Sequence, residues 1–181
     1  TDLDDAIVRE YGTKIAALVS VVRRCVARGE KLVVFSAWTR LLHVAAQALN
    51  AQALSSASLI GSSADKRDAL RRFGAVADEA TSGLAVPSEA PVLEHKALEA
   101  DSVGATTSCD VLLVPLFGGA SGAGGSGAAG LNLQVASVAV LLEPQLQSGI
   151  EQQAVGRISR IGQQRPSRCV RLIIADSIEH N

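Results

Sequence analysis

Several features are missing from this 181-residue chain, and each absence excludes a class of protein. No apolar run approaches the ~18 residues that cross a bilayer, so we expect no membrane span and no membrane partner. No charged, then apolar, then small-residue leader opens the chain, so nothing marks it for secretion. Methionine is absent and the chain begins with Thr1, from which we expect a piece of a longer protein.

Cysteine is scarce, and its spacing does not fit a metal site. Cys25, Cys109 and Cys169 lie far apart, and none belongs to a C-x-x-C pair. This pattern argues against a disulfide framework and against a zinc site. We therefore expect no metal ligands in this chain and a reducing compartment.

What the chain does contain is enough apolar material for one folded domain. Its length suits a single domain, and 48% of its residues are hydrophobic, which excludes wholesale disorder. The 17 basic and 18 acidic residues nearly cancel. They are unevenly placed, because residues 74–156 hold nine acids and one lysine, whereas residues 157–181 hold five arginines and two acids. A neutral total thus combines an acidic middle with a basic final segment.

Hydrophobic periodicity predicts alternating helices and strands. Apolar residues three or four apart predict helices over 13–28, 39–50, 65–73 and 150–161. Short continuous apolar runs predict buried strands over 31–36, 57–61, 110–116, 137–143 and 168–174. Ser63 is the expected cap of the third helix. Alternating strands and helices predict an α/β fold with a mainly parallel sheet covered by helices on both faces.

Two segments do not fit this alternation. Residues 74–109 are rich in small and acidic residues and hold Pro87 and Pro91, so we expect a flexible acidic insertion with a short helix near 91–100. Residues 117–130 are expected to form a glycine-rich loop. The rest of 1–181 is expected to form one domain.

The stretch around the fourth predicted helix carries the strongest chemical signal. Gln153, Gly156, Arg157 and Arg160 are spaced i, i+3, i+4 and i+7, so they would share one helix face. Two guanidinium groups there offer forked, charged donors to an anion, and Gly156 removes a side chain that would hold a ligand away. The alternative is a pair of ordinary surface arginines, and the spacing alone leaves both interpretations open.

Longer blocks of sequence favour the first interpretation. QAVGRISRIGQ (153–163) resembles motif six of the superfamily-two helicases, in the form found in Swi/Snf-type ATPases. GAAGLNL (127–133) resembles their motif five, with Ala128 in place of a glycine, and KLVVFSAWTRLL (31–42) resembles motif four. Three more family-like blocks are found at 11–19, 59–73 and 176–180. All six follow the family order, so the chain resembles the second RecA-like lobe of a Swi/Snf-type ATPase.

Two further blocks resemble a narrower group within this family. LLVPLFGG (112–119) and VLLEPQLQSG (140–149) look most like the SHPRH-type ubiquitin ligases, which are Swi/Snf-type ATPases that carry a RING domain. This resemblance implies ubiquitin-pathway partners for the parent protein.

The family resemblance implies a RecA-like three-layer α/β/α lobe from a two-lobe motor. Such a motor hydrolyses ATP and moves along double-stranded DNA or nucleosomes in the nucleus, in DNA repair and chromatin remodelling. ATP and Mg²⁺ would be held mainly by a first RecA-like lobe that is missing here. Arg160 matches the arginine finger and Arg157 its catalytic partner. Gln153, Gly130 and Gly156 match nucleotide-binding positions.

The same resemblance implies which residues contact DNA. Ser36, Trp38 and Asn132 match positions at which family members contact DNA, and a hydroxyl there can hold a phosphate without reading sequence. For Trp38 the alternative is a core or lobe-edge aromatic. Glu143 is expected to end a strand at the carboxyl edge of the sheet, and Glu151 to lie on a solvated helix face.

One absence limits what this chain does alone. It contains no G-x-x-x-x-G-K-[ST] phosphate loop and no Asp-Glu-x-His, so we expect it to bind ATP poorly and to hydrolyse none by itself. Two other hypotheses remain. One is a catalytically silent lobe that serves as a protein-interaction module in a ubiquitin ligase. The other is an unrelated α/β nucleotide-binding domain.

Overall fold

The structure, a computed structural model, describes residues 3–75, 108–117, 131–145, 147–160, 162–177 and 179. The helices in this part are α1 (Asp5–Tyr11), α2 (Thr13–Val26), α3 (Thr39–Ala51), α4 (Ser63–Phe73) and α5 (Ser148–Val155). The strands are β1 (Leu32–Ser36), β2 (Ser56–Ser58), β3 (Val111–Pro115), β4 (Val138–Leu141) and β5 (Arg168–Arg171). Most of the expected acidic insertion and glycine-rich loop, with the helix expected near 91–100, lies outside the described residues.

The strands form one five-stranded sheet in the order β2-β3-β1-β4-β5, and every pairing in it is parallel. The central strand β1 sets the register, with Leu32 opposite both Val111 and Val138. All strands therefore begin at one edge, the amino edge, and finish at the other, the carboxyl edge. The predicted parallel sheet is confirmed.

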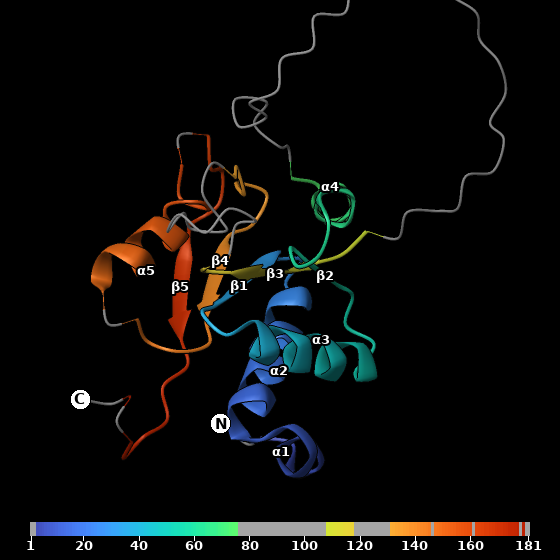
Figure 1. Cartoon of the computed structure of the whole chain (residues 1–181), viewed down its shortest axis with the longest axis vertical. Coiled ribbons are helices and arrows are strands. Elements are labelled where there is room, and N and C mark those ends of the chain that lie inside the picture. Colours follow the sequence, from blue (N-terminus) through green and yellow to red (C-terminus); the bar gives the residue numbers. More distant parts are fainter. Residues whose placement is uncertain are drawn as a thin grey trace, which may run out of the picture.

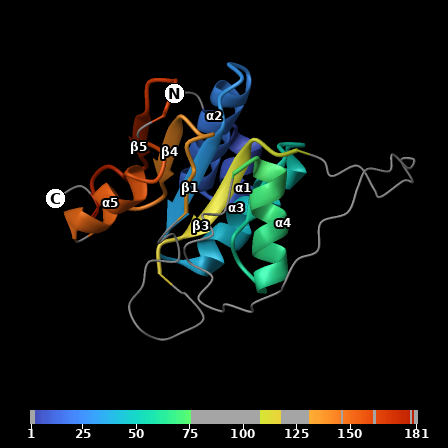
Figure 2. The ribbon, with the colours of Figure 1, turned by 90° about the horizontal axis from the view of Figure 1, so that it is seen from above.

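Helices cover both faces of this sheet (Figures 1 and 2). Side chains alternate along β1, so Leu32 and Val34 pack with α1, α2 and α3 on one face, whereas Val33 and Phe35 pack with α4 and α5 on the other. All five β1 residues are fully buried, as expected for a parallel strand covered on both sides. The result is the three-layer α/β/α, RecA-like arrangement that the sequence predicts.

The amino end of the chain adds one helix that the periodicity did not predict. The seven-residue helix α1 is short, and Ile7 is its one fully buried side chain. It packs beside α2 after a turn at Gly12, whose φ of +86° favours glycine. None of the helices in the described part combines the length and the apolar character that a bilayer-crossing helix needs.

The cap predicted for α4 is wrong by one residue. Ser62, not Ser63, is the N-cap, because its Oγ accepts a hydrogen bond from the Asp65 amide at 3.2 Å. The Asp65 carboxylate in turn accepts one from the Ser62 amide at 2.9 Å. This reciprocal capping box needs a three-residue spacing, which Ser62 and Asp65 have.

Candidate nucleotide and DNA site

Helix α5 brings the motif-six residues to the amino edge of the sheet. It follows the carboxyl end of β4 and runs back toward the amino edge (Figure 1). There the Leu133 amide, which lies shortly before β4, donates a hydrogen bond to the Arg157 carbonyl at 3.1 Å. The motif-five and motif-six segments are thus in direct backbone contact.

The predicted extent of this helix is wrong. It was expected to reach residue 161, yet α5 ends at Val155, so Arg157 and Arg160 lie beyond it. The amides of Arg157 and Ile158 bond to carbonyls three residues back, each at 3.1 Å, which tightens the chain into turns. The Arg157 carbonyl is also occupied by Leu133. The shared helix face therefore does not exist, and of the four site residues only Gln153 lies within α5.

The two arginines are nevertheless accessible. Arg157 is half-buried, and its guanidinium makes no hydrogen bond or ion pair within the described part of the chain, while Arg160 is exposed. Gln153 is exposed on α5. A Cβ added to Gly156 would lie 3.1 Å from the Gln152 carbonyl oxygen, so glycine suits this close turn. Gly130 lies outside the described residues.

Gln163 fastens this region together, and the sequence interpretation gave it no role beyond its place in motif six. Its side-chain Nε2 donates to the carbonyls of Gln134 (3.0 Å), Ala136 (2.7 Å) and Ile158 (3.0 Å). Its Oε1 accepts from the Arg165 amide at 3.0 Å. One amide side chain thus links the segment before β4 to the segment after α5.

Asn132 belongs to the same assembly. Its Oδ1 accepts a hydrogen bond from the Gln134 amide at 3.3 Å, and its side chain is half-exposed. The Gln134 carbonyl accepts a hydrogen bond from Gln163. As a result, Asn132, Arg157 and Arg160 all lie on one connected stretch at the amino edge.

The other predicted DNA contacts lie at the carboxyl edge. Ser36 is fully buried, and its Oγ donates to Glu143 Oε2 and accepts from the Trp38 amide, both at 3.0 Å. Glu143 also accepts from the Ala37 amide. This geometry makes Ser36 a support for the Trp38 turn rather than an accessible phosphate donor. Sequence reasoning placed Glu143 correctly at the strand end but gave it no such role.

Trp38 is not a core aromatic, since 68% of its surface is exposed. Its ring borders a hollow of about 350 Å³ at the carboxyl edge, together with Phe117, Gln145 and Ile150. The structure therefore does not bring Trp38 together with Asn132 and the two arginines, because the two groups lie at opposite edges of the sheet.

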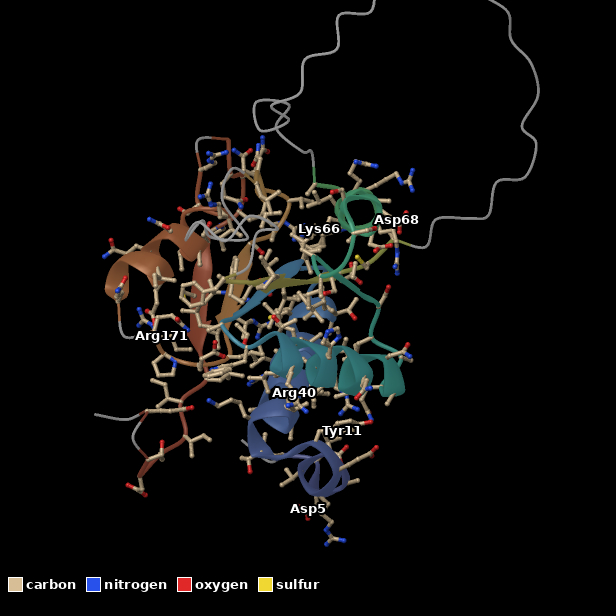
Figure 3. All side chains as sticks on the ribbon, in the orientation of Figure 1. Asp5, Tyr11, Arg40, Lys66, Asp68 and Arg171 are labelled. Atoms are coloured by element: carbon tan, nitrogen blue, oxygen red, sulfur yellow. The ribbon has the colours of Figure 1, made fainter. Side chains whose placement is uncertain are left out.

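The prediction that Glu151 is solvated is wrong. Only 8% of this residue is exposed, and its carboxylate accepts from Arg171 Nε at 2.7 Å and from the Gln145 amide at 3.1 Å. Arg171 lies on β5 (Figure 3), so this pair ties α5 to the edge strand of the sheet. Helical periodicity could not reveal a partner twenty residues away.

No cluster of three or more His, Cys, Asp or Glu side chains that could hold a metal ion occurs within the described ranges. The three cysteines are free thiols; Cys25 and Cys109 are buried, and burial raises the pKa of each.

Comparison with known proteins gives relatives that align with most of the chain or with part of it. No family model matches the chain. DNA repair protein rad5 of Emericella nidulans is 32% identical over 171 residues, which are 92% of this chain and 14% of that protein. DNA repair protein RAD5 of Saccharomyces cerevisiae is 44% identical over 54 residues, 30% of this chain and 5% of that protein. DNA (cytosine-5-)-methyltransferase DMT5 of Cryptococcus neoformans is 27% identical over 175 residues, 93% of this chain and 6% of that protein.

A solved structure supports the fold. The C-terminal part of the Fun30 ATPase domain matches with a TM-score of 0.64 at 19% identity, over 92% of this chain and 43% of that chain. The present chain spans at most 14% of the length of the three curated relatives named above. The ordered helicase blocks, the relative aligned along nearly the whole chain and the shared fold together show that the chain belongs to the Swi/Snf-type superfamily-two ATPases, as their C-terminal RecA-like lobe.

Proposed function

We propose that this chain is the C-terminal motor lobe of an ATP-dependent double-stranded DNA translocase that works in DNA repair or chromatin remodelling in the nucleus. Two of the relatives are named as DNA repair proteins, and the structural neighbour is part of an ATPase domain. These names support the class of activity. The activity of the whole parent protein is our proposal.

The observation that carries the proposal is the connected motif-five and motif-six stretch at the amino edge. The Leu133–Arg157 bond and the Gln163 contacts hold the chain after α5 in place, and this segment contains the half-buried Arg157 and the exposed Arg160. A positioned arginine lowers the barrier to phosphoryl transfer because it stabilises charge that develops on the γ-phosphoryl group. We assign Arg160 as the finger and Arg157 as its partner.

The remaining nucleotide contacts are assigned from the resemblance to motifs five and six. Gln153, on the exposed face of α5, and Gly156, at its end, would border the nucleotide, as would Gly130 of motif five. ATP and Mg²⁺ would be held mainly by the first RecA-like lobe, where Mg²⁺ neutralises phosphate charge. The arginines of this lobe would complete the site from across the cleft.

DNA would meet this lobe through backbone phosphates. Asn132 offers a half-exposed amide beside the motif-six stretch, and Trp38 offers an exposed ring at the other edge, positioned by Ser36 and Glu143. Amide donors can hold a phosphate without sequence preference. Nucleosomal DNA would present the same backbone.

The experiment is an ATPase assay of the parent protein with and without duplex DNA. A working motor should hydrolyse ATP several-fold faster when duplex is present, since DNA contacts at this lobe are coupled to the nucleotide through Asn132 and Gln163. Hydrolysis that is absent under both conditions would contradict the proposal. The assay should include the isolated chain, for which no hydrolysis is expected.

The acidic composition of residues 74–109 favours a second candidate, a catalytically silent lobe that binds proteins within a ubiquitin ligase. A parent sequence that lacks the phosphate loop and Asp-Glu-x-His in its first lobe, but contains a RING domain, would favour this candidate. Ubiquitin transfer without ATP hydrolysis would then be the expected activity.

A further inference from the structure

A second basic feature lies at the amino edge, where the end of α2 meets the starts of β4 and β5. A shallow cleft of about 400 Å³ is lined there by Arg28, Glu30, Ser137, Arg165, Pro166 and Arg168. We call it the arginine cleft. Three guanidinium groups and one carboxylate give it a formal charge of +2, although the chain as a whole has a net charge of −1.

Two of the three guanidinium groups are held in position by the protein. Arg165 Nη1 donates to the Gly29 carbonyl at 2.7 Å, and Arg168 pairs with Glu30 through one of its nitrogens. Each guanidinium has five N–H donors, so others remain for a ligand. Arg28 is exposed and forms no ion pair with another described residue. The cleft is therefore a set of partly fixed donors.

The chemistry of the lining favours a phosphate group. One arginine guanidinium can donate hydrogen bonds to two phosphate oxygens at once. It is also more weakly hydrated than the ammonium group of lysine, so it loses water more readily on binding. The lining holds no aromatic ring on which a base could stack. An open, shallow and basic surface suits the backbone of a polymer better than an enclosed small molecule.

The cleft is continuous with a residue already proposed to meet DNA. Asn132 Oδ1 accepts from the Gln134 amide, the Gln134 carbonyl accepts from Gln163, and Gln163 accepts from the Arg165 amide. Three hydrogen bonds thus join Asn132 to Arg165. We propose that the arginine cleft binds a backbone phosphate of duplex DNA, without reading its sequence, as an extension of the contact at Asn132. This inference rests on the proposed DNA-binding function.

The test measures the affinity of the chain for two duplexes of unrelated sequence at several salt concentrations. Each lost phosphate contact should reduce the slope of log K against log salt by about 0.9. We expect Arg165→Gln and Arg28→Gln each to weaken binding to both duplexes equally and to lower the slope by about this amount. The matched control is Arg9→Gln, because Arg9 is exposed on α1 and does not line the cleft.

Four outcomes separate the cleft from the wider proposal. A smaller slope in both cleft variants, with the control unchanged, supports the inference. Cleft variants that behave like Arg9→Gln overturn it and leave the proposed function standing. A wild-type chain that binds neither duplex overturns the DNA-binding proposal itself and the cleft with it. Effects that differ between the two duplexes would contradict binding through the backbone alone. Thermal melting of each variant confirms that these exposed substitutions leave the fold intact.

Discussion

Substituting Gln163 tests whether one side chain fastens motif five to motif six. In Gln163→Glu the shape is kept, but the amide that donates to the carbonyls of Gln134, Ala136 and Ile158 becomes an acceptor. Ala136 and Ile158 are fully buried, so their carbonyls would lose a partner that water replaces poorly. An amide has two hydrogens for these three acceptors. Two lost bonds at about 1 kcal/mol each, plus unsatisfied carbonyls, give a cost of about 2–4 kcal/mol.

Chemical denaturation of the chain measures this cost, and thermal melting checks it. A loss of about 3 kcal/mol corresponds to a fall in Tm of about 6–12 °C for a domain of this size. The matched control is Gln164→Glu, because its side chain is exposed and the charge change is the same. If the two variants differ by less than about 0.5 kcal/mol, the reasoning on Gln163 is refuted.

Two other features of the fold give further predictions. Ser62→Ala should reduce the free energy of unfolding by about 1 kcal/mol because it removes the cap of α4, whereas Ser63→Ala should change it by only a few tenths. If chemical denaturation shows equal losses of unfolding free energy in the two variants, the capping box is contradicted. Lys14 Nζ lies 2.6 Å from Glu179 Oε1, and this hydrogen bond is the main reason that the pKa of Glu179 is lowered. A lowered folded-state pKa stabilises the fold above the unfolded value of about 4.3, and the benefit is lost as pH falls through the folded value. Glu179→Gln should therefore be less stable than wild type by about 0.5–1 kcal/mol at neutral pH and equal to it in strong acid; a gap that persists in acid would contradict this.

The sequence predicted the central strands well because they are nearly continuous apolar runs, whereas β5, expected to be buried over 168–174, ends at Arg171 and is mostly exposed. LVVFS and VLLVP are buried at every position, so their pattern identifies strands covered on both faces. Helix ends were harder to predict. Helix α5 ends at Val155, and beyond it the Arg157 carbonyl accepts a hydrogen bond from the Leu133 amide in a distant part of the chain. Local periodicity contains no information about such a partner.

For the site as well, some features could be predicted from the sequence and others could not. The motif blocks identified the arginines and Asn132, and the structure joins them at one edge through Gln163. The blocks grouped Trp38 with Asn132 as DNA contacts, yet in a parallel sheet the two lie at opposite edges, because Trp38 follows β1 whereas Asn132 precedes β4. They also could not show that the Ser36 hydroxyl is buried against Glu143, since these residues are 107 positions apart.

The most direct test of the central claim is ATP turnover by the parent protein in which Arg160 is replaced by alanine, measured with duplex DNA present and compared with Arg9→Ala. If Arg160 completes an ATP site held by the first lobe, turnover should fall by about 10³-fold or more, while ATP binding and the melting temperature stay near the wild-type values. The Arg9→Ala control should hydrolyse ATP normally. Turnover that survives Arg160→Ala would contradict the account.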